Sequence, residues 1–180
     1  MKRILIAGVL LLALSLNAQA DFSRGVAAYK RADYNAAINI FHKLAAEGDH
    51  RAQFAMGLVY DRGHGVPQDK SKAFKWYEKG ASSGNAKAQY NLALMYQNAE
   101  GVPRDEPEAI RWYLKAAERG ISDAIERVHE LAEGGNAEVQ YQFANLYRKG
   151  NILPQTRTKP YDGIELLGNR DMPVPSIIWL

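Results

Sequence analysis

Residues 52–81 read AQFAMGLVYDRGHGVPQDKSKAFKWYEKGA, and residues 88–117 repeat this pattern as AQYNLALMYQNAEGVPRDEPEAIRWYLKAA. The shared alanine, tyrosine, glycine, aspartate and tryptophan positions each return 36 residues after their first occurrence. A fixed period between about 20 and 50 residues is the sequence signature of a stacked repeat array. One unit written twice therefore decides the fold, and the rest of the chain is interpreted from it.

Each unit is predicted to form a pair of helices. In the first unit we expect a helix over 51–61, a Gly/Pro loop over 62–68, a second helix over 70–81 and a short turn over 82–85. Apolar residues recur at spacings of three and four in both helices, which is typical of helices with one buried face. One such hairpin cannot bury its aromatic face alone, so the units must stack.

The ends of the second helices carry matching signals. Asp69 and Asp105 fall at the N-cap position, where a carboxylate accepts from free amides of the first turn. Gly84 and Gly120 follow the second helices, where a residue in the left-handed conformation is common. These positions predict where each second helix begins and ends.

The tryptophans are predicted to lie between the stacked hairpins. Trp76 and Trp112 fall on the apolar face of the second helices, and Gly57 and Ala93 lie beside the apolar face of the first helices. Small residues let a neighbouring helix approach closely, so bulky side chains of one helix fill the gaps left by the other. Neither tryptophan should therefore face water.

The joint spacing of Gly-Val-Pro, aspartate and Trp-Tyr in these two stretches resembles the Sel-one-like repeat (SLR) family, relatives of the tetratricopeptide repeats. The resemblance covers two full repeats well, and more of the chain loosely. It implies an all-α fold, a right-handed α–α superhelix of stacked helical hairpins that binds other proteins. It implies no chemistry.

We expect five segments in the chain. They are a signal peptide over 1–20, an N-terminal capping hairpin of the tetratricopeptide kind over 21–50, two full repeats over 51–120, a partial repeat over 121–155 and an irregular tail over 156–180. The capping hairpin keeps the 36-residue period in its second helix, but its loop is five residues shorter. Its weaker aromatic content fits a terminal unit that is covered on one side only.

The period breaks after Gly120. The next first-helix pattern begins at Val139, so 21 residues are missing from one unit. Residues 122–133 start like a first helix and end like a second helix. Either residues 137–148 occupy a second-helix position, or the stack is distorted here, and the sequence does not decide between these arrangements.

The final unit loses the repeat pattern. Pro160 stands where the earlier units have alanine, and a proline there lacks an amide and clashes with the preceding turn. Gly163 replaces the tryptophan, and a short helix that starts near Pro160 and ends by Gly168 stays open as an alternative. We expect residues 169–180 to be extended or disordered. Their apolar end, 177–180, suits a segment that covers the open end of the solenoid, one that docks on a partner, or a tail altered by frameshift or truncation.

The first 20 residues have the features of a secretory signal peptide. Lys2 and Arg3 form a basic start, residues 4–16 are apolar, and Ala18-Gln19-Ala20 is a small-x-small cleavage site. We expect cleavage after Ala20 and a periplasmic or secreted protein without a membrane span. An uncleaved anchor is the alternative, but the apolar run is short for a bilayer.

Composition excludes several classes of partner and site. The chain has 23 basic and 20 acidic residues, and removal of Lys2 and Arg3 leaves the two signs nearly balanced. The balance does not indicate a nucleic-acid partner. The absence of cysteine excludes disulfides, thiolate metal sites and a cysteine nucleophile. Packing between repeats must therefore hold the exported protein together.

The sequence contains no residue set with the spacing of an active site. His64 lies in a loop where the next unit has Glu100, which favours a variable solvated position over a ligand. His42, His50 and His129 lack the spaced partners of a zinc site, and the loop glycines are not followed by Gly-Lys-Ser/Thr. We expect no catalytic residues, no metal, no cofactor and no enzyme activity.

A stripe beside the core face of the first helices is the candidate partner-binding surface. An aromatic residue follows each shared glutamine, and further positions of the stripe lie one and two turns later. The stripe consists of Phe54, Leu58, Asp61, Tyr90, Leu94, Gln97, Tyr141, Asn145 and Arg148. Solenoids of this class hold peptides or helices on a concave surface. The alternative, which we favour slightly, is that these aromatics pack between adjacent units.

We therefore expect a monomeric, non-enzymatic scaffold or regulator of a protein complex in the bacterial cell envelope, with a protein or peptide partner that the sequence does not identify. One alternative is a secreted effector that acts on a host protein. Another is a β-lactam-binding or β-lactam-hydrolysing protein, because the resemblance extends to secreted, cysteine-rich members associated with that activity. This chain lacks the cysteines that hold those members together.

Overall fold

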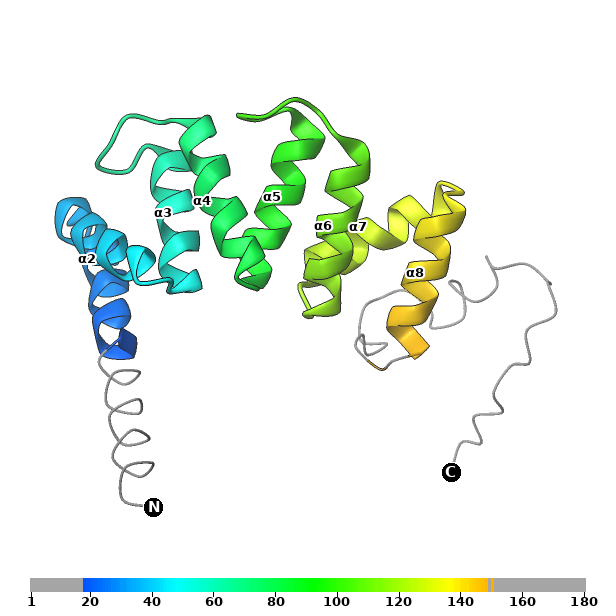
Figure 1. Ribbon diagram of the computed structural model, residues 1–180, viewed down its shortest axis with the longest axis horizontal. Helices are drawn as coiled ribbons and strands as arrows, with labels where there is room; N and C mark the ends of the chain where they lie inside the picture. The colour runs from blue at the N-terminus through cyan, green and yellow to red at the C-terminus, as the bar shows by residue number, and fades with distance from the viewer. Residues whose placement is uncertain (1–17, 149, 151–180) are drawn as a thin grey trace, which may run out of the picture. The chain divides into compact units, whose positions relative to one another are not determined.

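The computed structural model describes residues 18–148 and Gly150, and every regular element among them is an α-helix (Figure 1). The first described helix covers residues 18–30. The helices that follow are α2 (Tyr34–Ala46), α3 (His50–Arg62), α4 (Lys70–Ser82), α5 (Ala86–Asn98), α6 (Glu106–Glu118), α7 (Ser122–Glu133) and α8 (Ala137–Arg148). The expected all-α fold is confirmed.

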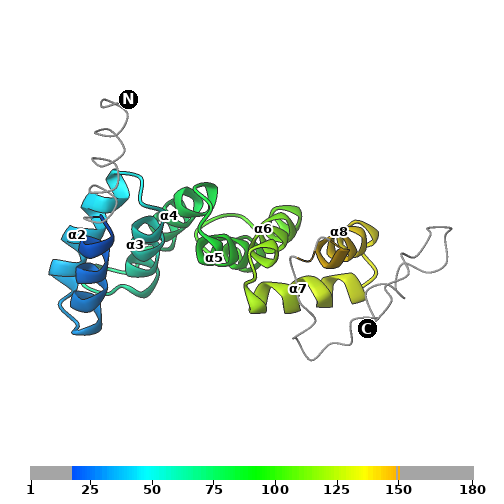
Figure 2. The same cartoon turned by 90° about the horizontal axis from the view of Figure 1, so that it is seen from below.

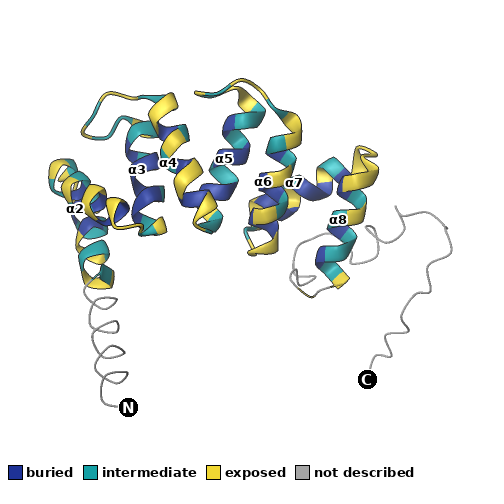
Figure 3. Ribbon diagram, viewed as in Figure 1, coloured by how far each residue is buried: buried dark blue, intermediate teal, exposed yellow. Residues whose placement is uncertain are grey.

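The described residues form two compact units. The first unit ends at Trp112, inside α6, and the second begins at Tyr113. In both units each helix turns one face inward, and that face carries alanines together with larger apolar side chains (Figure 3). Burial of this apolar surface is the main source of the stability of each unit.

The predicted helix ends are confirmed by hydrogen bonds and backbone angles. Asp33, Asp69 and Asp105 each accept a hydrogen bond from the amide three residues later, at 3.2, 2.9 and 3.0 Å. Gly84 and Gly120 have φ angles of +86° and +81°, in the left-handed region. These local signals end one helix and start the next without any contribution from distant parts of the chain.

The helices of the first full repeat are slightly longer than the sequence pattern predicts. The expected helix over 51–61 runs from His50 to Arg62, and the one over 70–81 runs from Lys70 to Ser82. The earlier start of α3 follows from Asp49, whose carboxylate caps the helix by accepting from the amides of the first turn.

In the first unit, helices α2 to α5 lie side by side in chain order (Figures 1 and 2). A core cluster at its N-terminal end includes Phe41, Leu44 and Met56, which are each at most 2% exposed. These side chains come from α2 and α3, so the N-terminal hairpin shares one core with the repeat that follows it. The hairpin therefore covers the first face of that repeat, as a capping unit does.

The two tryptophans are shielded from water to different degrees. Trp112 is 6% exposed. Trp76 is half-buried and packs against the N-terminal core cluster, with the Lys79 ammonium 4.7 Å from the centre of its ring. The expectation that neither ring faces water is confirmed for Trp112, whereas Trp76 is shielded only in part.

In the second unit, α8 lies against α7 (Figure 2). The buried side chains between them include Val128, Val139 and Phe143, all at most 1% exposed. The Phe143 ring also meets the buried His129 ring edge-on, with ring centres 5.6 Å apart. A small apolar core therefore joins these two helices.

One glutamine ties each first helix to the helix before it. Gln53, Gln89 and Gln140 each donate from Nε2 to the backbone carbonyl of the alanine eight residues earlier, at 3.4, 3.1 and 2.9 Å. A buried amide N–H without an acceptor is costly, so this bond also satisfies the side chain itself. The shared bond identifies α3, α5 and α8 as first helices.

Helix α7 combines the start of a first helix with the end of a second helix. It begins after Gly120, where the amide of Ile121 donates to the carbonyl five residues back at 3.1 Å, as at the start of α3 and α5. It ends before the left-handed Gly135 and is followed by the Gln140 hydrogen bond, as α2 and α4 are followed by theirs. Residues 137–148 therefore make the glutamine contact of a first helix, while the start of α7 is also that of a first helix.

Several sequence predictions fall outside the described residues. These are the basic and apolar parts of the signal peptide within 1–17, and the predictions for residues 151–180, including Pro160 and Gly163. Residues 18–20 are described, and they are helical. In the described part of the chain, none of the helices has both the length and the apolar character needed to cross a membrane.

Candidate interaction surface

On α3, the predicted stripe faces the second helix of the same repeat. The Phe54 ring lies 5.9 Å from the Tyr77 ring of α4, measured between ring centres. A Cβ atom added at Gly57 would meet the Tyr77 ring at 2.4 Å, so the absence of a side chain there lets the ring in. Tyr77 is fully buried in this position. Phe54 therefore packs within its own repeat.

Asp61, at the end of the α3 part of the stripe, is engaged by α4. Its carboxylate accepts from the Tyr77 hydroxyl at 3.2 Å and from the Lys70 ammonium at 2.6 Å. Burial and the negative charge of Asp61 raise the pKa of the Tyr77 phenol far above its usual value, which keeps the phenol neutral. Asp61 therefore holds the two helices of the repeat together.

The α5 part of the stripe consists of Tyr90, Leu94 and Gln97, and all three are half-buried. They project from the same positions as the α3 residues one repeat earlier. Half-buried side chains of this kind keep some contact area for a partner while packing along the helix surface. This part of the stripe is accessible in the first unit.

The α8 part of the stripe is the most accessible. Tyr141 is 51% exposed and is the one large apolar side chain that is exposed in the described part of the chain. Arg148 is exposed too, and its guanidinium donates to the side-chain oxygen of the half-buried Asn145 at 3.0 Å. Three stripe positions on one helix thus present an aromatic ring, an amide and a cation.

The loop residue His64 contacts the preceding hairpin, which corrects the expectation of a solvated loop position. Its Nδ1 atom and the Tyr29 hydroxyl are joined by a hydrogen bond of 2.7 Å. Its ring stacks on the ring of Tyr34, with centres 4.9 Å apart. The expectation failed because both partners precede the loop by about one repeat in sequence, so no local pattern reveals the contact.

Glu100 makes the corresponding contact one repeat later with different chemistry. It accepts from the Lys70 ammonium at 2.7 Å, and Lys70 stands 36 residues after Tyr34. The hydrogen bond to Asp61, and to a lesser degree the one to Glu100, raise the pKa of Lys70. One structural position thus joins successive repeats through an aromatic stack in one place and an ion pair in the next.

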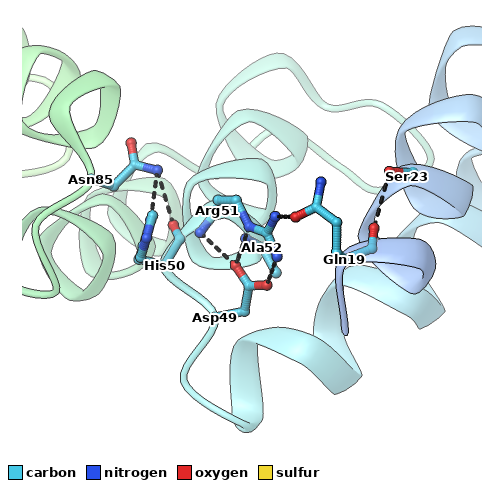
Figure 4. Close-up of polar contacts among 7 residues, drawn as sticks. All are labelled: Gln19, Ser23, Asp49, His50, Arg51, Ala52 and Asn85. Carbon is cyan, nitrogen blue, oxygen red and sulfur yellow. Dashed lines mark hydrogen bonds and ion pairs between the residues drawn. The ribbon is translucent and has the colours of Figure 1, made fainter. Parts of the chain in front are cut away.

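A polar cluster at the start of α3 joins three consecutive hairpins (Figure 4). The Asp49 carboxylate accepts from the Arg51 guanidinium at 2.6 Å and from its amide at 2.8 Å. Arg51 also donates to the side chain of Gln19. On the other side, the Asn85 side chain donates to the backbone carbonyl of His50 at 3.3 Å.

The pKa of Asp49 is lowered although burial alone would raise it. The hydrogen bonds from the Arg51 side chain and from the amides of Arg51 and Ala52 outweigh the desolvation. The carboxylate is therefore held in its charged form, in which it caps α3 and orients Arg51.

Residue types that perform chemistry are scattered through the described helices. Among those residues, no group of three or more histidines, cysteines, aspartates or glutamates is placed to hold a metal ion. The Lys70 ion pairs with Asp61 and Glu100 join helices, and most of the other ion pairs among the described residues are local pairs along one helix. The arrangement described above is suited to holding and presenting a surface.

A model of the Sel1 repeat family matches residues 22–49, 50–85 and 86–121 of the chain. A Sel1 repeat protein from Oxalobacter formigenes has a similar solved structure, with a TM-score of 0.61 and 31% identity, covering 73% of this chain and 55% of that one. A protective antigen of uropathogenic Escherichia coli that displays an SLR fold gives a TM-score of 0.63 at 26% identity, covering 77% of this chain and 32% of that one.

The curated proteins with a similar stretch include DAP3-binding cell death enhancer 1 of Rattus norvegicus. It is 46% identical over 44 residues, which make up 24% of this chain and 9% of that protein. The chain thus spans less than a tenth of the length of this relative. The shared stretch is short enough to reflect the repeat alone.

Proposed function

The chain belongs to the Sel1 repeat family, and we propose that it is a non-enzymatic protein-interaction scaffold or regulator of the bacterial cell envelope. Sel1 repeat proteins are generally protein-interaction scaffolds, and the all-α solenoid with SLR-type neighbours agrees with that role. The proposed partner is a protein or peptide that binds along the stripe on the first helices.

Tyr141 is the observation that carries the proposal. An aromatic side chain that is 51% exposed contributes contact area at low entropic cost, and aromatic residues are enriched among binding hot spots. It lies on one helix with Asn145 and Arg148, which add hydrogen-bond donors and acceptors around the ring. Such a combination of an aromatic anchor with a polar rim is typical of protein-binding surfaces.

Export to the periplasm or beyond is the second part of the proposal. It rests on the basic, apolar and small-residue pattern of the first 20 residues. Cleavage after Ala20 would remove Gln19 from the Arg51 side chain, but Arg51 would keep its hydrogen bonds to Asp49. The start of α3 should therefore tolerate processing.

Capture from envelope extracts tests the binding role. The full chain, tagged at its C-terminus and expressed in the native host, is compared with Tyr141→Ala and with a Tyr90→Ala, Leu94→Ala double variant. We expect partners captured by the parent to be lost in at least one variant while the melting temperature stays unchanged. Lys43→Ala, an exposed position on α2, is the matched control. If all variants captured the same partners as the parent, the stripe would not be the binding surface.

Cell fractionation with N-terminal sequencing tests export. We expect the protein in the periplasmic or extracellular fraction with Asp21 as its first residue. A chain that keeps its first 20 residues and stays in the cytoplasm would contradict this part of the proposal without affecting the binding role.

A further inference from the structure

The stripe on α3 is the place where a second helix docks. Tyr77 of α4 contacts the Phe54 ring, occupies the space left by Gly57 and donates to Asp61. The Lys70 ammonium, at the start of α4, adds an ion pair with Asp61. In this repeat, the second helix therefore brings to the first helix a bulky aromatic side chain and a charge that complements the end of the stripe.

Among the described residues, helix α8 presents the same positions without a second helix packed on them. The Gln140 hydrogen bond fixes the register, so Tyr141, Ala144 and Arg148 stand at the positions of Phe54, Gly57 and Asp61. We call Tyr141, Ala144, Asn145 and Arg148 the α8 face. No helix follows α8 within the described residues.

The exposure of the α8 face differs from that of its counterpart on α3. Gly57 is buried, whereas Ala144 is only half-buried. Phe54 and Asp61 are half-buried, whereas Tyr141 and Arg148 are exposed. The position that receives Tyr77 on α3 is therefore more accessible on α8. Ala144 has a Cβ atom where Gly57 has none, so a helix that packs here must lie slightly farther from α8 than α4 lies from α3.

The charge at the end of the stripe is reversed between the two helices. Asp61 is met by the cationic Lys70 on α4, whereas α8 has Arg148 at the same position. Arg148 uses one donor for the Asn145 side chain, and a guanidinium has five. An acidic side chain is the group that complements the remaining donors.

We infer that the α8 face is the docking site for an amphipathic helix of a partner protein. This inference rests on the proposed function. The partner helix places a tyrosine or tryptophan over Ala144, beside the Tyr141 ring, and an acidic residue at Arg148. It thus packs on α8 as α4 packs on α3, but farther out because of the Ala144 Cβ atom, and with the opposite charge at the end of the stripe. The acidic residue distinguishes this helix from the second helix that the chain itself supplies to α3.

Two synthetic peptides serve as probes. One copies residues 69–83, which include α4, and the other carries Lys70→Glu in the same sequence. Each is titrated into the ¹⁵N-labelled full chain, and binding is followed by amide chemical shifts. We expect shifts on α8 with both peptides and tighter binding of the Lys70→Glu peptide, by about two- to fivefold, the size expected of an exposed ion pair.

Substitutions on the α8 face test the assignment of each group. Tyr141→Ala should weaken both peptides by about tenfold, as expected of an aromatic anchor. Arg148→Glu should reverse the charge preference, so that the unmodified peptide binds more tightly. Gln142→Ala is the matched control, because this half-buried residue lies on α8 outside the α8 face, and it should change neither affinity.

Three outcomes would overturn the inference. An unchanged preference in Arg148→Glu would remove the role of charge. Sedimentation showing a dimer that Tyr141→Ala dissociates would assign the face to a second copy of the chain. Amide shifts in residues 151–180 caused by Tyr141→Ala would assign it to the chain's own C-terminal segment.

The capture experiment separates this inference from the proposed function. If envelope partners are lost with the Tyr90→Ala, Leu94→Ala variant and kept with Tyr141→Ala and Arg148→Glu, the scaffold role stands and the α8 inference fails. If no variant changes the captured partners, the proposal that the stripe binds the partner is wrong as a whole.

Discussion

The ammonium of Lys70 lies 2.7 Å from a carboxylate oxygen of Glu100, which belongs to the loop of the following repeat. The same ammonium lies 2.6 Å from Asp61 of its own repeat. One side chain thus joins the two helices of a repeat to each other and to the next repeat. Both ion pairs are partly exposed, so their energetic contribution is modest. They nevertheless fix the loop that carries Glu100 next to the start of α4.

We predict that Lys70 and Glu100 are energetically coupled. In a double-mutant cycle with Lys70→Ala and Glu100→Ala, the coupling free energy should be about 0.5–1 kcal/mol and should shrink in high salt, because the pair is partly solvated. Urea unfolding followed by circular dichroism provides the measurement. A coupling energy of zero at low salt would show that the contact does not hold the repeats together.

Asp49 should make the stability of the protein sensitive to acid. Because its pKa is lowered in the folded state, its contribution to the free energy of unfolding is present above the unfolded pKa of about 3.9 and is lost as the pH falls through the lowered folded value. Asp49→Asn keeps the cap, as Asn85 does naturally one repeat later, but it removes the charge. We expect Asp49→Asn to cost about 1 kcal/mol at pH 7.

The difference between the parent and Asp49→Asn should shrink as the pH falls below the usual aspartate range, and it should disappear once the carboxylate is protonated in the folded protein as well. The converse substitution Asn85→Asp should make the next helix start acid-sensitive. Unfolding curves of the parent and of Asp49→Asn are recorded at several pH values. If both lost stability in parallel as the pH fell, Asp49 would not be the source of the acid sensitivity.

Ala99→Gly should stabilise the protein. Ala99 ends α5 with a φ of +57°, whereas Gly63 ends α3 with a φ of +70°. A left-handed conformation costs a residue with a side chain about 1 kcal/mol relative to glycine, so the substitution should recover about that amount. Gly63→Ala is the matched control and should lower stability, also because its Cβ would lie 3.0 Å from the Gln68 amide nitrogen. Equal effects of the same sign would refute the backbone explanation.

Gly57→Ala should destabilise the first repeat by about 1–3 kcal/mol, because the added Cβ would overlap the Tyr77 ring. A smaller residue at position 77 should relieve the overlap. In the background of Tyr77→Leu, which is destabilising by itself, the further cost of Gly57→Ala should therefore fall below its cost in the parent. Thermal unfolding of the four proteins gives both costs, and equal costs in the two backgrounds would rule out the predicted contact.

The repeat pattern predicted most of the helices because their signals are local. Asp69 and Gly84 mark the start and end of α4 by hydrogen bonds and angles within a few residues, so the sequence contains the whole explanation. Burial of Trp112 also followed from periodicity, because the apolar face of an amphipathic helix must be covered.

The contacts between repeats were not predictable in the same way. His64 and Glu100 share a position but pair with an aromatic ring in one repeat and a cation in the next, so comparison of the repeats suggested variability instead of a contact. The role of α7 was open because each end of the helix follows a different pattern. The Gln140 hydrogen bond relates α8 to the first helices, and the recurrence of that glutamine one residue after alanine or valine was the signal available in the sequence.

Because the two ends of α7 are specified independently, this array is not restricted to growing or shrinking by whole hairpins. A genetic event that joins the front of one helix to the back of another leaves both neighbouring turns intact, and the array then contains an odd number of helices at that point. Evolution can thus alter the order of helix types along the array, and with it the surfaces that neighbouring helices offer, by a single in-frame loss.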